Sequence, residues 1–184
     1  MKAVLATHNA GKTQELSRLL GGAGIELVNL ADCGVSRIPE ETGATFLENA
    51  RIKAEAAVKA TGLPSIADDS GLCADALGGA PGVDSANYDI PWLLRRMEGE
   101  TNRRAYFICQ LVLLFPNGRE ILADGRCDGE ILYTPQGEGG FGYDPVFYLP
   151  EKNLSMAQLT PEEKNAVSHR GRAIERLLKI FGDS

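Results

Sequence analysis

Two adjacent carboxylates, Asp68 and Asp69, stand in the stretch "IADDSGL", directly after a short hydrophobic run. We interpret the run as a short strand and the aspartates as part of an acidic turn. Carboxylates that emerge from a buried strand are costly unless a cation meets them. Mg²⁺ is the natural candidate, because it takes few carboxylates and keeps water or phosphate oxygens on its other positions. The alternative interpretation is a helix N-cap beside a solvated aspartate.

A second acidic pair, Glu40 and Glu41, lies in "PEETG", just before a predicted helix. Acidic residues near a helix start complement the helix dipole, and this alone is sufficient to explain the pair. Glu41 becomes a candidate metal ligand only if the fold brings it towards Asp69. The sequence therefore leaves both interpretations of Glu41 open.

Lys12 lies in "ATHNAGKT", whose last three letters are typical of a phosphate-binding loop. A Walker loop also needs a glycine five positions before Gly11, and that position holds Ala6. The setting still suits phosphate, because "KAVLA" before the loop indicates a strand and "KTQELSRLL" after it indicates a helix. Helix N-terminal amides beside a lysine make an anion site. A plain turn with a solvated lysine is the alternative.

The stretch "GGFGYDP" combines three glycines, at 139, 140 and 142, with two aromatic rings. The glycines let backbone approach a ligand closely. Phe141 and Tyr143 offer flat faces for a base, and the proline after Asp144 biases that aspartate to an extended conformation. The alternative is a tight loop with both rings packed inward.

Cations gather in "EEKNAVSHRGR", where Lys164 lies near the start of a predicted helix. His169 and Arg170 follow Ser168, a candidate cap for the last helix. Two polar groups at a helix–helix corner suit contacts with phosphate or with base edges. A charged surface junction is the alternative. Taken together, the cations, the metal-binding carboxylates and the aromatic loop describe a site for a nucleoside triphosphate with Mg²⁺.

The elements that would position these residues are strands alternating with helices. We expect strands over 2–6, 24–30, 105–115 and 119–132, with a hairpin turn at Asn117-Gly118 between the last two. Residues 64–71 are expected to form a short strand that runs into the acidic turn. Thr45 and Glu48 form a capping box before an alanine-rich helix that ends near Gly62. Thr160 begins a second capped helix, and an amphipathic helix follows it. The pattern predicts a mixed α/β domain with a long antiparallel element.

Composition excludes several classes of protein. The chain has 184 residues, which suits a single domain over 1–184. A formal net charge of −6 argues against nucleic acid and anionic membrane as partners. Four scattered cysteines without a C-x-x-C pair predict reduced thiols, rather than a zinc or redox site, and favour a cytoplasmic location. We find no signal-peptide core and no transmembrane run.

Six motifs occur in one order along the chain: "ATHNAGK", "ETGATFLENA", "ADDSGL", "LGGAPGVDSA", "GGFGYDP" and "SHR". Together they resemble the inosine/xanthosine triphosphate pyrophosphatase family, the Ham1-like non-canonical purine NTP pyrophosphatases. The resemblance implies a two-lobed α/β fold, with a long mixed sheet flanked by helices and a cleft between the lobes. It also implies a homodimer that uses Mg²⁺ to hydrolyse ITP, dITP and XTP to the monophosphate and pyrophosphate.

The resemblance implies roles for residues at matching positions. Asp69 would be the proton acceptor and, with Glu41, a Mg²⁺ ligand. The substrate-binding residues would be Thr7, His8, Asn9, Ala10, Gly11, Lys12, Ser70, Phe141, Gly142, Tyr143, Asp144, Lys164, His169 and Arg170.

Three other functions compete with this one. A Maf-like pyrophosphatase would act on modified pyrimidine triphosphates and differs in base preference alone. A nucleotide sensor without turnover would need no metal carboxylates, so the Asp68-Asp69 pair speaks against it. A nucleic-acid-binding module is disfavoured by the negative net charge.

Overall fold

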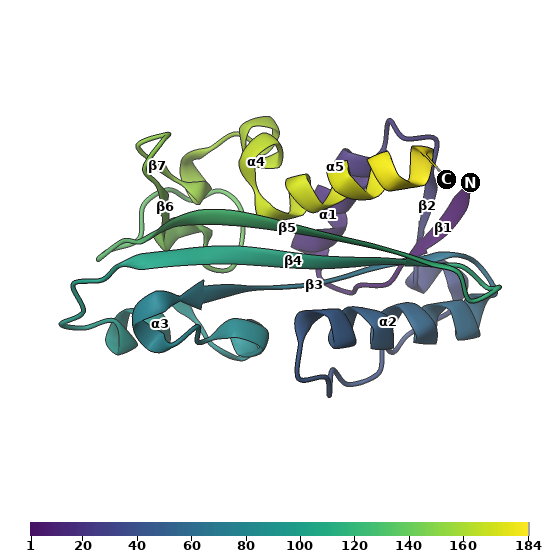
Figure 1. Cartoon of the computed structure of the whole chain (residues 1–184), viewed down its shortest axis with the longest axis horizontal. Coiled ribbons are helices and arrows are strands. Elements are labelled where there is room, and N and C mark those ends of the chain that lie inside the picture. Colours follow the sequence, from purple (N-terminus) through teal and green to yellow (C-terminus); the bar gives the residue numbers. More distant parts are fainter. Residues whose placement is uncertain (184) are drawn as a thin grey trace.

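The computed structural model describes residues 1–183 and is built on one seven-stranded sheet (Figure 1). The strands are β1 (Lys2–Leu5), β2 (Glu26–Asn29), β3 (Ser65–Ala74), β4 (Arg104–Leu114), β5 (Glu120–Ile131), β6 (Phe147–Leu149) and β7 (Leu154–Ser155). The helices are α1 (Ala10–Leu20), α2 (Phe46–Thr61), α3 (Ile90–Arg96), α4 (Pro161–Val167) and α5 (His169–Gly182). The predicted α/β fold class, with a long mixed sheet flanked by helices, is confirmed.

The sheet is parallel at one end and antiparallel at the other, in the order β2-β1-β3-β4-β5-β6-β7. β1 lies between β2 and β3, so the chain passes from β1 to β2 on one side and later returns to form β3 on the other side of β1. Such a switch point opens a crevice beyond the carboxyl ends of the strands. β1 pairs with β3 only at Ser65 and Ile66. Beyond Ile66, β4 is the only strand among residues 1–183 that pairs with β3, apart from one isolated bridge between Cys73 and Pro81. The candidate site lies along that unpaired edge of β3.

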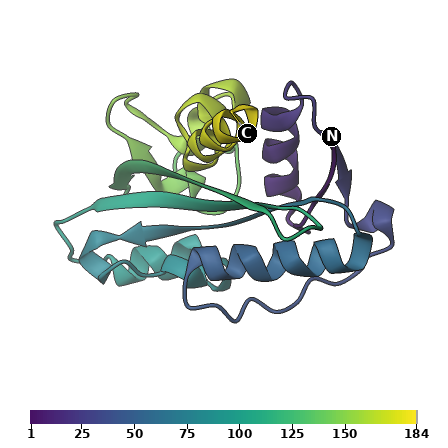
Figure 2. The same cartoon turned by 45° about the vertical axis from the view of Figure 1, so that its right-hand side comes forward.

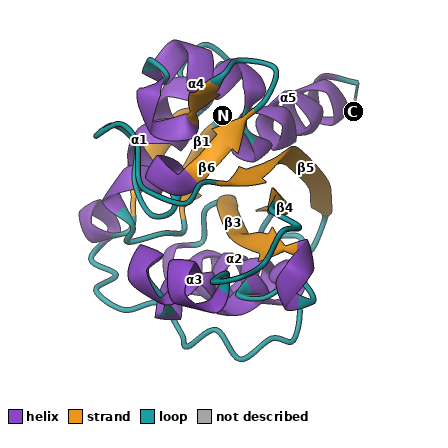
Figure 3. Ribbon diagram, turned by 90° about the vertical axis from the view of Figure 1, so that its left-hand side faces the viewer, coloured by secondary structure: helices purple, strands orange, loops and turns teal. Residues whose placement is uncertain are grey.

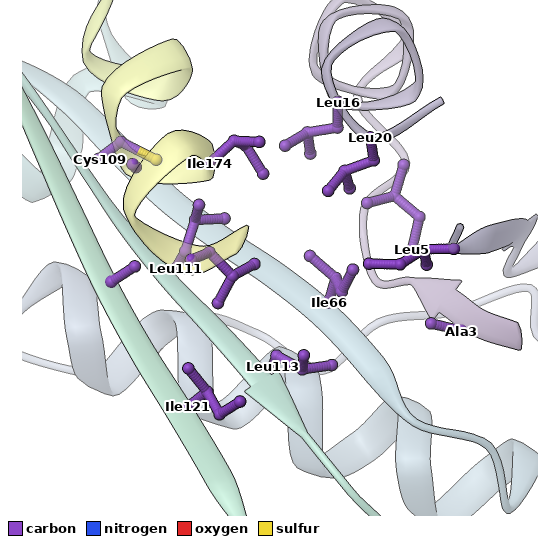
Figure 4. Close-up of a cluster of buried hydrophobic side chains, with 14 residues drawn as sticks. Ala3, Leu5, Leu16, Leu20, Ile66, Cys109, Leu111, Leu113, Ile121 and Ile174 are labelled. Atoms are coloured by element: carbon purple, nitrogen blue, oxygen red, sulfur yellow. The ribbon is translucent and has the colours of Figure 1, made fainter. Parts of the chain in front are cut away.

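Helices cover both faces of the sheet (Figures 2 and 3). α1, α4 and α5 lie on one face, and α2 and α3 lie on the other (Figure 1). On the first face, Leu16 and Leu20 of α1 pack with Ile174 of α5 and with Ile66 and Leu111 of the sheet (Figure 4). This continuous apolar contact fixes α1 and α5 relative to each other, because burial of such side chains is the main stabilising term in folding.

Local capping signals account for the helix ends. Thr45 and Glu48 form the predicted capping box of α2, which ends at a left-handed Gly62. Thr160 caps α4 and Ser168 caps α5, as expected. β4 and β5 form the predicted hairpin, with Gly118 at φ 85° in its turn. The short elements α3, β6 and β7 were not among the elements expected from the sequence.

The expectation of an acidic turn after a short strand is wrong. Asp68 and Asp69 lie in the middle of β3, a ten-residue strand whose pairing with β4 runs from Ser65 to Ala74. Because successive side chains of a strand point to opposite faces, the two carboxylates enter different layers of the protein.

Two further expectations can be compared with the structure. The four cysteines have free thiols, and Cys73, Cys109 and Cys127 are buried. None of the helices formed by residues 1–183 combines the length and the apolar character that crossing a bilayer requires.

Candidate active site

A cavity of about 380 Å³ lies beside the free edge of β3. Residues from both layers line it, including the loop after β1, the segment before α2, the middle of α2, the glycine-rich loop and the corner between α4 and α5. Every residue expected in the site lines this cavity except Ala10 and Gly11, namely Thr7, His8, Asn9, Lys12, Glu41, Asp69, Ser70, Phe141, Gly142, Tyr143, Asp144, Lys164, His169 and Arg170. The fold therefore brings together residues as far apart in the chain as Thr7 and Arg170.

The loop between β1 and α1 is ordered by its own side chains. Asn9 is the N-cap of α1, and its Oδ1 accepts a hydrogen bond from the Lys12 amide at 3.0 Å. Thr7 Oγ1 accepts from the Asn9 amide at 3.1 Å. Lys12 then points into the protein, where its Nζ lies 3.1 Å from Asp68 Oδ2. The solvated-lysine alternative is wrong, because the Lys12 side chain is only 14% exposed.

Gly11 serves a contact that the sequence did not reveal. A Cβ atom at this position would lie 2.5 Å from Cδ1 and 2.8 Å from Cγ of Phe141. The glycine thus lets the aromatic ring of the distant loop rest on the first turn of α1. Ala10 and Gly11 line a separate, shallow hollow between α1 and the end of β2.

Gly11→Ala is expected to lower the free energy of unfolding by about 1–2 kcal/mol, because the new methyl group overlaps the Phe141 ring. Denaturant unfolding at neutral pH measures the difference. Gly22→Ala is the matched control, since its Cβ would meet no atom within 4 Å. Equal stabilities of the two variants would contradict a tight contact between Gly11 and Phe141.

Asp68 is fully buried among cations on the α5 side of the sheet. Its Oδ2 lies 3.1 Å from Lys12 Nζ and 3.2 Å from Arg170 Nη2. Burial alone would raise its pKa, but Lys12 and Arg170 overcome that effect and hold the pKa of Asp68 well below its usual range. Asp68 is therefore an ionised carboxylate that holds two cations in the cleft.

Asp69 points to the opposite face, towards α2. Asn49 Nδ2 donates to its Oδ2 at 3.2 Å, and Lys53 Nζ lies 3.6 Å from its Oδ1. Burial and the nearby Glu41 raise the pKa of Asp69, and Lys53 only partly opposes them. The two neighbouring aspartates thus have opposite electrostatic environments, and only Asp69 lines the cavity.

Lys53 links Asp69 to Glu41. Its Nζ lies 2.7 Å from Glu41 Oε1, in addition to the contact with Asp69 Oδ1. Both carboxylates therefore face one point that a cation already occupies, which is the condition set above for a role of Glu41. Burial opposes the charge of Lys53, but Asp68, Asp69 and Glu41 outweigh it and raise the pKa of the ammonium group.

Asn49 and Lys53 were not expected in the site, although a signal for them exists. They are four residues apart on α2, so they share a helix face. That face also carries the buried alanines Ala50, Ala54 and Ala57. Two polar side chains on the buried face of an alanine-rich helix indicate partners elsewhere in the fold.

The glycine-rich loop is tied to both layers. Tyr143 is buried, and its hydroxyl lies 2.9 Å from the carbonyl oxygens of Ser85 and Tyr88 across the cleft. Asp144 Oδ2 accepts from the Phe141 amide at 2.9 Å and from Lys164 Nζ at 2.5 Å. Burial raises the pKa of Tyr143 to about 12, so its hydroxyl keeps its proton. Tyr143 therefore anchors the loop, while the half-buried Phe141 keeps part of its ring towards the cavity.

His169 is a neutral side chain at the inner end of the cavity. Its ring stacks on Phe107, with centroids 4.7 Å apart. Burial, reinforced by Arg170 and Lys164, lowers the pKa of His169 well below its ordinary value. Its Nδ1 is buried without a hydrogen-bond partner among residues 1–183. A neutral imidazole with one unsatisfied nitrogen can donate to a ligand or accept from it.

Arg170 is almost wholly engaged within the protein. Its guanidinium donates to Asp68 from two nitrogens, to Ser70 Oγ at 2.9 Å, and to Glu15. These bonds use four of its five N–H groups. Arg170 therefore holds the residues of the site together, and one N–H of its Nη1 takes no part in these bonds.

The cleft combines a lysine at the start of α1, two convergent carboxylates and an aromatic loop, and these features are typical of an α/β enzyme that acts on nucleotides. Residues 3–180 match the Ham1 family, and the chain belongs to that family. This result confirms the resemblance inferred from the six motifs.

Curated relatives and solved structures agree with the assignment. A dITP/XTP pyrophosphatase of Thermus thermophilus is 50% identical over 194 residues, covering 100% of this chain and 93% of the relative. Another, of Geobacillus kaustophilus, is 48% identical and covers 95% and 91% of the two chains. The HAM1 protein of Coxiella burnetii has a similar structure, with a TM-score of 0.91, 41% identity and 100% coverage of both chains. The Ham1 protein of Staphylococcus aureus gives 0.88 and 38%, also with 100% coverage of both chains.

Proposed function

We propose that this protein hydrolyses ITP, dITP and XTP to the nucleoside monophosphate and pyrophosphate, and so cleanses the nucleotide pool. The family and the names of the curated relatives support this activity. The observation that carries it is the convergence of Glu41 and Asp69 in the cavity that Lys12 also lines. A carboxylate pair beside an anion-binding loop supplies the two parts that hydrolysis of a phosphoanhydride needs.

Glu41 and Asp69 fit a divalent metal ion such as Mg²⁺. Their oxygens converge on one cation, Lys53, and both are hard oxygen ligands. Among residues 1–183, no three His, Cys, Asp or Glu side chains form a group that could hold a metal. Two carboxylates suffice for Mg²⁺ when substrate phosphates and water complete the shell. When bound, Mg²⁺ would offset negative charge on the phosphates.

The charges of the cleft also support a metal. Its ion-paired groups are the cations Lys12, Lys53, Lys164 and Arg170 and the carboxylates Glu15, Glu41, Asp68, Asp69 and Asp144. Four positive and five negative charges leave one net negative charge. A triphosphate is itself strongly negative, so its binding to this cleft needs the added positive charge of a metal ion. It also needs some of the four cations to exchange their carboxylate partners for phosphate oxygens.

Residues around Asp69 and Lys12 would act on the phosphates, and residues of the aromatic loop would bind the base. Asp69 would accept the proton of the water that attacks the α-phosphorus, and its raised pKa suits a base. Lys12 and the amides at the start of α1 would stabilise the departing pyrophosphate. Ser70 would hold the phosphates beside Asp69. The ring of Phe141 would stack on the base, with Gly142 and the anchored Tyr143 shaping the pocket.

Base choice would come from donors at the inner end of the cavity. ITP and XTP carry an oxygen at C6, whereas ATP carries an amino group. His169 and the free N–H of Arg170 would donate to that oxygen, and they would face the amino group of ATP donor to donor. Lys164 would add a second cation, beside Arg170, at the same end. GTP shares the oxygen at C6, so its rejection needs a further contact at C2.

A panel of nucleotides tests this function. We expect kcat/KM for ITP and XTP to exceed that for ATP by about 10²-fold, because an unpaired buried donor costs ~1–3 kcal/mol. Pyrophosphate release is measured for ITP, XTP, GTP, ATP and a modified pyrimidine triphosphate, with Mg²⁺ and with a chelator. Equal hydrolysis of ATP and ITP, or turnover in the chelator, would contradict the proposal. Preference for the pyrimidine would favour the Maf-like alternative.

The remaining expectations extend the same proposal. We infer that each chain folds as one domain over 1–184 and that two chains form a homodimer. We also infer that the protein works in the cytoplasm and acts on free nucleotides rather than on nucleic acid. The free thiols and the net charge of −6 support the last two points. Sedimentation velocity at micromolar concentration tests the dimer.

A further inference from the structure

Glu15 is a buried carboxylate that the proposed chemistry does not use. It lies on α1, one turn after Lys12, and is 9% exposed. Its Oε1 lies 2.5 Å from Lys164 Nζ, and its Oε2 accepts from Arg170 Nη1. One acidic side chain therefore holds two of the cations that line the cavity.

The helix that carries Glu15, α1, also carries Lys12 and directly follows the proposed phosphate-binding loop. Lys12 and Glu15 are three residues apart and so share one face of α1. Leu16 and Leu20 lock α1 against Ile174 of α5 (Figure 4). The separation between Lys12 and Glu15 is thus set by a rigid helix rather than by a loop.

From Glu15, a chain of contacts runs to the aromatic loop. Lys164 Nζ lies between Glu15 and Asp144, at 2.5 Å from each. Asp144 accepts from the Phe141 amide, and Lys164 Nζ lies 4.8 Å from the centre of the Phe141 ring. The path Glu15–Lys164–Asp144–Phe141 connects the phosphate end of the cleft to its base end.

We propose that Glu15 is a positioning residue that fixes the distance between the phosphate-binding loop and the base-binding loop. The inference rests on the proposed function, since it assigns Lys12 to the phosphates and Phe141 to the base. A ligand gains full affinity only when both of its ends fit at once, and a rigid spacing supplies that condition. Glu15 touches neither end of the ligand and acts through Lys164 and Arg170.

Glu15→Gln tests the spacing, because it keeps the side chain's shape and removes its charge. Without that charge, Lys164 keeps Asp144 and Arg170 keeps Asp68 and Ser70. The ionic link between α1 and the aromatic loop is then lost, and the packing of Phe141 on Gly11 remains. We expect KM for ITP to rise about tenfold or more, the loss typical of a charged hydrogen bond. Affinity for inorganic tripolyphosphate with Mg²⁺, which needs only the phosphate end, is expected to change by less than about threefold.

The measurements are steady-state kinetics with ITP, calorimetric titration of tripolyphosphate and of inosine, and thermal unfolding. Glu120→Gln is the control, because Glu120 pairs with Arg51 at the protein surface, where ion pairs contribute little. Glu15→Asp is the second variant. It keeps the charge but is one methylene shorter, and we expect an intermediate KM. In a Lys164→Met background the effect of Glu15→Gln is expected to shrink, as coupled residues require.

Two results would overturn the inference. One is an equal loss of affinity for ITP and for tripolyphosphate, which would restrict Glu15 to the phosphate end. The other is a lower unfolding temperature with an unchanged KM, which would make Glu15 structural only. Failure of the unmodified protein to hydrolyse ITP would instead contradict the proposed function. The titrations of tripolyphosphate and inosine would still compare the two ends of the cleft in that case.

Discussion

Replacing Asp69 with Asn is expected to lower kcat for ITP by about 10³-fold or more while leaving the fold intact. Loss of a general base alone costs ~10²–10⁴-fold, and the same carboxylate is a proposed metal ligand. The fold tolerates the change because the pKa of Asp69 is raised by burial, so its ionised form is disfavoured in the folded protein. A neutral amide of the same shape removes that cost. Lys53 keeps its 2.7 Å contact with Glu41.

The measurement is pyrophosphate release at saturating ITP, together with calorimetric binding of a non-hydrolysable analogue and thermal unfolding. Asp128→Asn is the control, because Asp128 is an exposed strand residue paired with Arg126. Turnover by the Asp69 variant within about tenfold of the unmodified protein would remove Asp69 from the role of base. Loss of both turnover and thermal stability would show that the variant had failed to fold.

Local signals explain how much of this fold could be predicted from the sequence. The caps of α2, α4 and α5 and the turn at Asn117-Gly118 are specified by residues a few positions apart, and all of them are present. The predicted turn at Asp68 and Asp69 is wrong because contacts with distant residues, and not local signals, determine the structure there. Ser70 and Gly71 are typical of a turn, but both pair with β4 within β3. Glycine is needed at position 71 because a Cβ there would lie 2.4 Å from the carbonyl oxygen of Gly82.

The same distinction applies to the site. The loop motifs could be recognised because their residue types are unusual together, and nearly all of them line one cavity. Glu15, Asn49 and Lys53 could not be recognised from type alone, because each is an ordinary polar residue on a helix. Their roles depend on which way α1 and α2 are rotated against the sheet, and long-range packing sets that rotation.

Replacing Asp68 with Asn, one position away from the proposed base, is expected to have the opposite result. The change leaves Lys12 and Arg170 buried with less compensating charge. Removing one member of a buried ion pair typically costs ~3–5 kcal/mol, and we expect a loss of about 3 kcal/mol in the free energy of unfolding at pH 7. Asp124→Asn, which breaks an exposed pair with Arg176, is the control and is expected to cost less than about 1 kcal/mol.

The dependence on pH gives this prediction a second, independent check. The pKa of Asp68 is lowered on folding, so its ionised form stabilises the folded protein at every pH above its unfolded value of about 4. That contribution is lost as the pH falls through the folded pKa. Denaturant unfolding of the two proteins should therefore differ fully at pH 7 and progressively less below about pH 4. A difference that stayed constant down to pH 3 would mean that Asp68 stabilises the fold by its shape and hydrogen bonds, and not by the charge it presents to Lys12 and Arg170.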